Sequence, residues 1–272
     1  MKDKILIFGK GFIGTRLQEA LDCRCTDRMI LTLADIEEEI KKFKPKIIIN
    51  CIGYIGRNVD ECEFNKDATL SANSFVPILM AEAALRNNIK LVHISSGCIF
   101  KYDYKKDKPI KEDRVPDFFD LFYSRSKIYA ERALEALMKK YPILIVRIRV
   151  PLDDRPSPRN LLDKLKKYKD IIDVPNTVTY LPDFVKAVRH LIKINAAGIY
   201  HVACKGALYY PDLMKAYKKY VPDFEYKVIP LKKLGLVRTN LVLSTEKLAK
   251  SGFKVRKVEE VIEECVKNYL KY

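Results

Sequence analysis

The chain has 272 residues, of which 48% are hydrophobic and 32% are charged. This length supports one large core, or a large domain with a smaller lobe, and the residue balance excludes a disordered chain. No apolar run approaches the roughly 20 residues of a membrane span, so we expect no membrane association. The seven cysteines are scattered and lack a matching cluster of metal ligands, which predicts no metal site and a reduced, cytoplasmic setting.

The formal net charge of +16 at pH 7 allows two interpretations. Clustered Lys and Arg would indicate nucleic-acid binding, because they neutralise phosphates. Here the lysines are mixed with glutamates along helical stretches such as Glu37–Lys44 and Glu259–Lys271. We therefore expect no nucleic-acid partner, and a positive field that favours a substrate carrying phosphates.

The first half of the chain alternates short strand patterns with helical patterns, which predicts a parallel α/β sheet. The expected strands are Lys4–Phe8, Lys46–Cys51, Lys90–Ser95 and Ile143–Arg149, and the helices between them are Ile13–Leu21, Ile36–Phe43, Ser74–Asn87 and Ser124–Lys140. The proline-rich stretch Arg149–Arg159 predicts a loop. It separates a dinucleotide-binding domain, residues 1–150, from a substrate-binding lobe, residues 151–272, of which some segments return to the first core.

Helical patterns dominate the second lobe. They cover Asn160–Tyr168, Pro182–Ile194, Pro211–Tyr220 and Lys257–Leu270, with strands expected at Gly198–Ala203 and Phe224–Ile229. The last helix carries an apolar stripe made by Val258, Val261, Ile262, Cys265, Val266 and Tyr269. A stripe at this spacing predicts a core-facing surface.

A glycine motif, G-x-G-x-x-G, directly follows the first strand and opens a helix. Glycines at this spacing allow a tight turn and bring the backbone close to a pyrophosphate at the helix N-terminus. The motif predicts a dinucleotide site formed by Gly9, Lys10, Gly11, Phe12, Ile13 and Gly14. Beyond it, Lys10, Arg24 and Arg28 provide cations that suit the 2′-phosphate of NADP, which favours NADPH over NADH. The alternative is that these are merely three of the 51 basic residues.

Two further segments indicate ketone reduction. Tyr123 and Lys127 lie four residues apart on one predicted helix face, where an ammonium favours the ionised form of the phenol. Such a tyrosine can donate a proton to a forming alkoxide. Ser95 and Ser96 end the third strand, at the edge where ligands bind in open α/β sheets. The order of glycine loop, serine and Tyr-x-x-x-Lys is more specific than any one of its parts.

In this combination the chain resembles the extended short-chain dehydrogenases of the dTDP-4-dehydrorhamnose reductase family, and within it the bifunctional 3,5-epimerase/4-reductases that make a nucleotide-linked rhamnose. The matching segments are Gly56–Cys62, Gly97–Asp103, Phe122–Lys127, Val146–Pro151, Pro158–Asn160 and Ile172–Asn176. The resemblance implies a Rossmann-type doubly wound parallel sheet with a smaller C-terminal substrate-binding lobe. It also implies NADP(H) as cofactor, a UDP- or dTDP-linked 4-keto-6-deoxyglucose as substrate, and a homodimer.

The same resemblance implies roles for individual residues. The reductase residues are Ser96, where the family usually has threonine, with Tyr123 and Lys127, and the epimerase residues are Cys98 and Lys164. The expected cofactor site adds to the glycine motif the residues Arg28, Asp35, Ile36, Cys51, Ile52, Gly53, Tyr123 and Lys127. The expected substrate site is Gly56, Arg57, Ser96, Cys98, Asn160, Lys164 and Asn176.

Three alternatives remain. The chain is a reductase that acts only at carbon 4, a non-catalytic relative with the same fold, or a basic nucleic-acid-binding protein. Cys98 and Lys164 disfavour the first alternative, and the presence of Ser96, Tyr123 and Lys127 disfavours the second.

Overall fold

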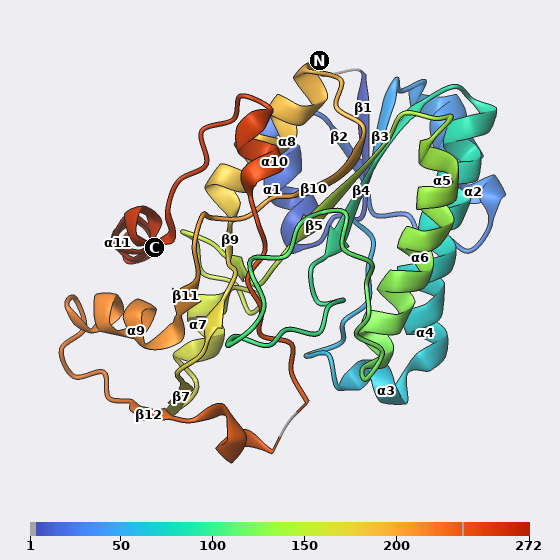
Figure 1. Cartoon of the computed structure of the whole chain (residues 1–272). Helices are drawn as coiled ribbons and strands as arrows, with labels where there is room; N and C mark the ends of the chain where they lie inside the picture. Colours follow the sequence, from blue (N-terminus) through green and yellow to red (C-terminus); the bar gives the residue numbers. More distant parts are fainter. Residues whose placement is uncertain (1–3, 236) are drawn as a thin grey trace. The chain divides into compact units, whose positions relative to one another are not determined.

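The computed structural model describes residues 4–235 and 237–272 (Figure 1). The chain divides into two compact units. The first contains the residues up to Ile99, with Pro116–Arg147 and Val188–Tyr200, and the second contains Phe100–Val115, Ile148–Ala187 and His201–Tyr272. The units interleave along the chain more than a division at residue 150 implies, because Phe100–Val115 leaves the first unit and Val188–Tyr200 returns to it.

A six-stranded sheet forms the centre of the first unit, in the order β10-β5-β4-β3-β1-β2. The strands are β1 (Ile5–Phe8), β2 (Arg24–Thr26), β3 (Ile47–Asn50), β4 (Lys90–Ser96), β5 (Ile143–Ile148) and β10 (Gly198–His201). β1 pairs in parallel with β2 and β3, and β3 pairs in parallel with β4. The strand order reverses between β1 and β3, the kind of switch point where open α/β sheets bind ligands. The predicted Rossmann-type sheet is confirmed.

Helices flank this sheet. They are α1 (Phe12–Leu21), α2 (Leu33–Phe43), α3 (Glu61–Phe64), α4 (Lys66–Leu70), the π-helix η1 (Ser71–Phe75), α5 (Val76–Arg86) and α6 (Phe122–Met138), while α8 (Leu181–Lys193) is divided between the two units. α2, α5 and α6 lie side by side on one face of the sheet (Figure 1). Their amphipathic spacing buries Ile36, Ile40, Met80 and Leu134 against Ile48 and Leu91 of the strands.

One continuous helical stretch, Lys66–Arg86, is long and apolar enough by length and composition to cross a membrane, although we expected no such run. Half of this stretch is buried inside the protein. Because the core helix of a globular domain meets the same criteria, the match is weak support for a membrane span.

In its described part, the second unit contains three short strand pairs and its own helices. β6 (Pro151–Leu152) pairs with β9 (Thr179–Tyr180), β7 (Asp170–Ile172) with β12 (Lys227–Ile229), and β8 (Pro175–Asn176) with β11 (Leu208–Tyr209). The helices are α7 (Leu161–Leu165), α9 (Tyr210–Lys218), η2 (Leu231–Leu234), α10 (Glu246–Lys250) and α11 (Val258–Tyr269). All six residues of the predicted stripe on α11 are buried in a core shared with α7 and α9, which confirms that prediction.

Candidate active site

The glycine motif forms the turn between β1 and α1. Gly9 has a φ of 97°, and a Cβ atom there would lie 2.9 Å from the backbone nitrogen of Ile52. A Cβ atom on Gly14 would lie 1.9 Å from the carbonyl oxygen of Gly9. A Cβ atom on Gly11 would meet nothing within 4 Å among the described residues. The protein's own packing thus requires glycine at positions 9 and 14, whereas a glycine at position 11 fits the close approach of a dinucleotide.

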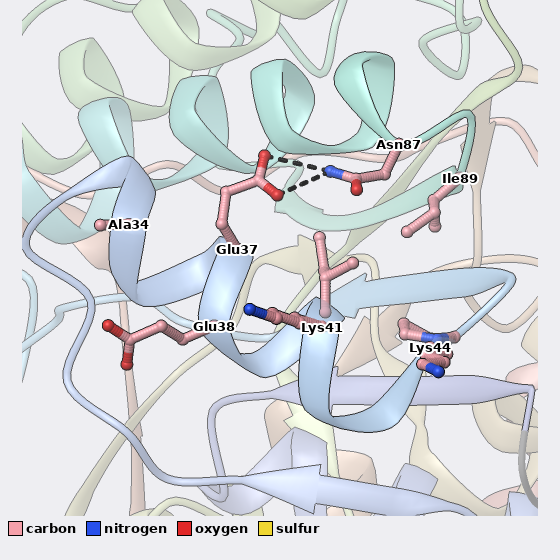
Figure 2. Close-up of a pocket in the computed structure, with 9 residues that line it drawn as sticks. Ala34, Glu37, Glu38, Lys41, Lys44, Asn87 and Ile89 are labelled. Carbon is pink, nitrogen blue, oxygen red and sulfur yellow. Dashed lines mark hydrogen bonds between the residues drawn. The ribbon is translucent and has the colours of Figure 1, made fainter.

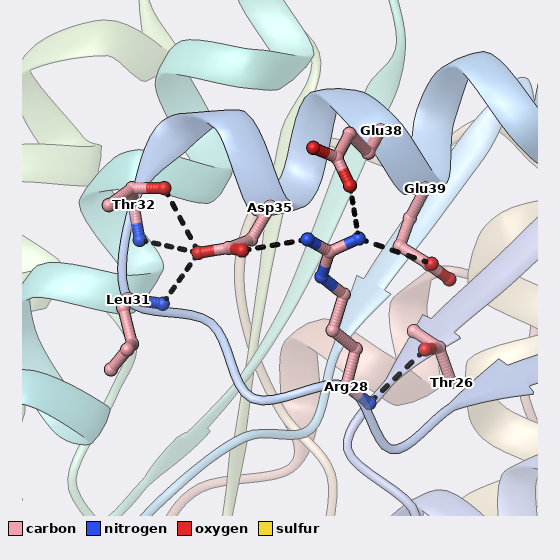
Figure 3. Close-up of polar contacts among 7 residues, drawn as sticks. All are labelled: Thr26, Arg28, Leu31, Thr32, Asp35, Glu38 and Glu39. Atoms are coloured by element: carbon pink, nitrogen blue, oxygen red, sulfur yellow. Dashed lines mark hydrogen bonds and ion pairs between the residues drawn. The ribbon is translucent and has the colours of Figure 1, made fainter.

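Arg28 lies just beyond β2, in a network with the start of α2 (Figure 3). Its guanidinium donates to Asp35 Oδ1 at 2.9 Å and to Glu38 Oε2 at 2.6 Å. Asp35 Oδ2 accepts from the backbone nitrogens of Leu31 and Thr32 at 3.0 and 2.8 Å. These backbone bonds, with Arg28, hold the pKa of Asp35 well below its usual range. Asp35 therefore caps α2 and orients Arg28, whose charge is already met by carboxylates.

The expected group of three cations is not formed, because Arg24 lies elsewhere. Arg24 begins β2, and its guanidinium lies 5.2 Å from the ring centroid of Phe43, the last residue of α2. Arg28 contacts the first turns of the same helix. Since Arg24 stacks on an aromatic ring at the other end of α2, it does not join Arg28. Lys10 is exposed in the glycine loop.

The residues after β3 bring a third element to this edge. A Cβ atom on Gly53 would lie 3.2 Å from Lys127 Nζ and 3.3 Å from Asn73 Oδ1. Asn73 lies in the π-helix η1, and its amide bonds both the nitrogen and the oxygen of Tyr54, at 2.9 and 2.8 Å. π-helical turns occur often at functional sites. The structure thus adds Asn73, which our sequence reasoning missed, to the predicted Gly53 and Lys127.

Three other residues of the expected cofactor site have different surroundings. Ile36 is fully buried in the core between α2 and the sheet, and its role toward the cofactor stays a prediction. Ile52 is half-buried, and its nitrogen donates to Asn50 Oδ1 at 2.9 Å. Cys51 is half-buried beside Gly14, and burial raises the pKa of its thiol, which disfavours a reactive thiolate.

Tyr123 and Lys127 lie on the first turns of α6, both nearly buried. Lys127 is 5% exposed, and its Nζ lies 6.0 Å from the ring centroid of Tyr123. Burial lowers the pKa of Lys127 to about 8, and the neighbouring Glu131 opposes that shift. A lysine with this pKa still carries most of its charge at neutral pH, so it favours the ionised form of a neighbouring phenol.

The start of α6 is fixed by side chains from other elements. Leu121 precedes the helix and has no capping group, and Glu63 of α3 accepts from the nitrogen of Phe122 at 2.5 Å instead. A carboxylate at a helix N-terminus also complements the helix dipole. Ser74 Oγ of η1 donates to the oxygen of Ser126 at 2.7 Å. Two helices therefore hold the turn that carries Tyr123.

Ser95 and Ser96, at the end of β4, have different partners, because successive side chains of a strand point to opposite faces. Ser95 Oγ donates to the buried Glu131 at 2.5 Å. Ser96 Oγ accepts from the nitrogen of Cys98 at 3.1 Å, and Ser124 Oγ of α6 donates to the oxygen of Cys98 at 2.5 Å. Of the two serines, Ser96 is thus linked to the first turn of α6.

From the sequence we expected an extended chain from Ser96 to Cys98, with both side chains on the same side, and this expectation is wrong. β4 ends at Ser96, and Cys98 lies in the following turn, where its nitrogen bonds the Ser96 hydroxyl. Side-chain direction at Cys98 therefore does not follow from strand alternation. Cys98 is half-buried.

The expected substrate residues make contacts within their own units. Gly56 has a φ of 56°, and a Cβ atom there would overlap Glu61, which accepts from the exposed Arg57. Asn160 caps α7, and its side chain also bonds backbone groups of Asp153 and Arg155. In both segments these contacts shape the loop, and direct contact with a substrate stays a prediction.

Asn176 and Lys164 lie in the second unit. Asn176 is buried, accepts from Arg149 Nε at 3.1 Å, and donates to Tyr210 Oη and Asn240 Oδ1 at 2.9 and 3.1 Å. These bonds join β8 to neighbouring segments. Lys164 is half-buried on α7, which is shorter than the predicted helix. Their roles toward a substrate stay predictions.

A surface hollow of about 600 Å³ lies between α2 and α5 (Figure 2). Its lining includes Glu37, Lys41 and Lys44, and Glu37 accepts two hydrogen bonds from Asn87 Nδ2, at 3.0 and 2.9 Å. The residues that lead into β3 and β4 border this hollow, so it lies away from the carboxyl edge that carries Ser96 and Gly53.

The family model that describes the RmlD substrate binding domain matches residues 3–271. The chain belongs to this family. A bifunctional dTDP-4-dehydrorhamnose 3,5-epimerase/dTDP-4-dehydrorhamnose reductase of Arabidopsis thaliana is 31% identical over 268 residues, which cover 89% of this chain and 85% of the relative. The chain also matches trifunctional rhamnose-forming proteins of the same plant, at 27–29% identity, and spans about two fifths of their length.

Solved structures show the same fold as this member of the RmlD family. The UDP-rhamnose synthase of Acanthamoeba polyphaga mimivirus superposes with a TM-score of 0.90 at 23% identity, over 97% of this chain and 99% of that one. The dTDP-4-dehydrorhamnose reductase of Bacillus anthracis, in complex with NADP, gives a TM-score of 0.84 at 23% identity, over 97% and 98%. The resemblance inferred from sequence motifs is thus confirmed for the family.

Proposed function

We propose that the chain is an NADPH-dependent reductase of a nucleotide-linked 4-keto-6-deoxy sugar. The observation that carries this proposal is the convergence of Ser96, Tyr123 and Lys127 on two adjoining elements, the end of β4 and the start of α6, which the backbone of Cys98 links. The glycine turn follows β1 at the same edge of the parallel sheet. Two similar proteins are named as dTDP-4-dehydrorhamnose reductases, which supports the substrate class.

Each of the three side chains has a role in reducing a ketone. Ser96 Oγ accepts a hydrogen bond from the Cys98 nitrogen, so its own proton remains available for the substrate carbonyl. The Tyr123 hydroxyl donates a proton to the oxygen that becomes the alcohol, and the Lys127 ammonium stabilises the phenolate left behind. Bound NADPH would supply the hydride.

The glycine turn provides the fit for the dinucleotide. Gly9 and Gly14 shape the turn, Gly11 leaves room beside the backbone, and the first nitrogens of α1 would contact the pyrophosphate. Arg28, held by Asp35 and Glu38, would contact the 2′-phosphate. This interaction requires the guanidinium to exchange a carboxylate for the phosphate.

We further propose that the same pocket inverts carbons 3 and 5 of the sugar. A 4-keto group acidifies the protons on both carbons, and their inversion needs an acid and a base on opposite faces. The resemblance assigns these roles to Cys98 and Lys164, and Ser96 and Tyr123 would hold the enolate oxygen. A reductase limited to carbon 4 is the alternative.

The test is a direct assay with UDP- or dTDP-4-keto-6-deoxyglucose and, in parallel, with the same sugar already epimerised at carbons 3 and 5. The purified chain is incubated with UDP- or dTDP-4-keto-6-deoxyglucose and NADPH, cofactor oxidation is followed by absorbance, and the sugar is identified by NMR. An L-rhamnose nucleotide would support both activities. Reduction of only a pre-epimerised substrate would support the alternative, and no oxidation with any of these sugars would contradict the proposed reductase.

A further inference from the structure

A buried charge network lies beneath Tyr123 and Lys127. Glu131 is on α6, one helical turn after Lys127, and neither Glu131 nor Arg147 of β5 is exposed. Arg147 Nη2 donates to Glu131 Oε2 at 2.6 Å, and Arg147 Nε donates to both carboxylate oxygens, at 2.9 and 3.1 Å. Ser95 Oγ of β4 donates to Oε1 at 2.5 Å. The carboxylate therefore joins α6 to the two strands beneath it.

The position of this carboxylate matters for Lys127. Residues four apart on a helix face have Cβ atoms about 5–6 Å apart. Both side chains are shielded from water, so the negative charge acts on the ammonium through a poorly screening medium. Arg147 and Ser95 fix the direction of the Glu131 carboxylate, because their hydrogen bonds reach it from two strands of the sheet.

We propose that Glu131 is a positioning residue, which keeps the Lys127 side chain protonated and in place beside Tyr123. This inference rests on the proposed function, in which Lys127 stabilises the Tyr123 phenolate. Glu131 does not need to touch a substrate, and it acts only through Lys127.

The other groups that face Lys127 do not replace this charge. Among the described residues, these titratable groups are Cys62 of α3, Cys98 after β4, His93 of β4 and Tyr123 of the same helix, and none of the four is a carboxylate. Burial raises the pKa of the Cys62 thiol. Burial, with Lys127, lowers the pKa of His93 to about 3, so its ring is neutral. The neighbouring Asn50 Nδ2 lies 3.3 Å from His93 Nδ1, which suits a neutral ring.

The test compares Glu131→Gln with a matched control, Glu135→Gln. Glu135 is one turn further along α6 and also contacts Arg147, at 3.7 Å. Selective ¹³C labelling of lysine and NMR titration give the pKa of Lys127 in the ligand-free chain, with Lys127→Arg identifying its signal. We expect Glu131→Gln to lower the Lys127 pKa by about one to two pH units, and Glu135→Gln to leave it unchanged.

A second variant separates charge from stability. Glu131→Gln leaves the buried Arg147 without its main partner, which destabilises the fold. Adding Arg147→Met removes the unpaired charge, so the double variant should regain stability while the Lys127 pKa stays low. If the double variant is folded and Lys127 titrates as in the wild type, the proposal is overturned.

The enzymatic measurement gives the functional consequence. In the pH profile of the reduction rate, the fall on the alkaline side should move to lower pH by the same one to two units, both in Glu131→Gln and in the double variant. A uniform loss of rate with this alkaline fall unmoved would show a purely structural role and overturn the proposal. A lowered Lys127 pKa in a chain that reduces none of the sugars would instead reject the proposed function and leave the Glu131–Lys127 coupling standing.

Discussion

Tyr123 and Lys127 share one face of α6, and the structure gives them different surroundings. Lys127 lies over buried groups of β4 and α3, whereas Tyr123 is at the first turn, next to the Ser124 hydroxyl that holds the Cys98 turn. Tyr123→Phe removes the acid and keeps the ring that packs there. We expect the reduction rate to fall by roughly 10² or more with little change in thermal unfolding. A folded variant with near wild-type kcat would reject Tyr123 as the proton donor.

Arg28 is the residue on which we expect the choice between NADPH and NADH to depend. Because Glu38 holds the Arg28 guanidinium and would compete with a 2′-phosphate for it, we expect Glu38→Gln to tighten NADPH binding several-fold and to leave NADH binding nearly unchanged. Arg28→Ala should reduce the preference for NADPH. Arg24→Ala is the control, since Arg24 stacks on Phe43. Fluorescence titration measures the Kd of each cofactor for the wild type and for each variant, and equal NADPH and NADH affinities in the wild type would contradict the prediction.

Substitution of Cys98 tests whether the chain catalyses epimerisation in addition to reduction. With Cys98→Ala we expect no exchange of the protons on carbons 3 and 5 in heavy water, measured without NADPH. The variant should still reduce a keto sugar that is already epimerised, because the Ser96 and Ser124 contacts involve only the backbone of Cys98. Undiminished exchange in the folded variant would leave a reductase limited to carbon 4.

At the scale of elements, the sequence predicted the helices and strands that have a clear periodicity or a continuous apolar run of their own. The periodicity of Leu33–Phe43 and the apolar runs at β3 and β4 located the helix and the strands within a few residues. β2 has only three residues, too few for a visible alternation, and was not predicted. The π-helix η1 continues into α5 without a break in composition, so no sequence signal marked it or the role of Asn73.

The polar network of the site was the least predictable part. Glu131 follows Lys127 by one helical turn, and this spacing was a usable signal that we did not use. Its partners Ser95 and Arg147 are 36 and 16 residues away in sequence. Their contact depends on strand order and register, which a single sequence does not reveal. The network was therefore visible only in the folded chain.

The glycine turn allows a test of how one element serves both fold and cofactor. Gly14→Ala places a Cβ atom against the carbonyl of Gly9, so α1 must move from β1, and we expect a loss of about 1–3 kcal/mol in unfolding free energy. Gly11→Ala meets no protein atom within 4 Å. It should keep its stability and lose affinity for NADPH. Urea unfolding and cofactor titration of both variants separate the two roles, and a strongly destabilised Gly11→Ala would contradict this division.

At the scale of the whole molecule, some of the basic side chains pair with carboxylates at the surface, and a net charge of +16 remains. On α11, Lys267 pairs with Glu263 at 3.5 Å. Arg256, just before this helix, pairs with Asp183 of α8 at 2.8 Å and with Glu264 of α11 at 2.5 Å. The exposed Lys267–Glu263 pair contributes little to stability and is weakened by salt. The electrostatic field of the net positive charge attracts anions in general. Because salt screens this field, a substrate with a diphosphate would bind more weakly as ionic strength rises.

The acid stability of the first unit provides the last prediction. His93 is fully buried on β4, and its pKa is lowered from an ordinary value of 6.5 to about 3 by burial and by Lys127. Below pH 6.5 the unfolded chain takes up a proton that the folded chain does not, so stability falls as pH falls between about 6.5 and 3. By linkage, this one group lowers the unfolding free energy by about 1.4 kcal/mol for each pH unit in that window.

His93→Gln removes the group that takes up a proton and keeps an acceptor for the Asn50 amide. We expect the variant to be less stable than the wild type at pH 7, because glutamine fills the site less well, and to lose stability more slowly on acidification. Urea unfolding at a series of pH values from 7 to 4 measures both slopes. Carboxylates contribute equally to the two proteins, so the difference in slope isolates His93. If the unfolding free energies of the two proteins fall with pH at the same slope, His93 takes up its proton in the folded protein near pH 6.5. That result would contradict a buried, neutral His93 ring.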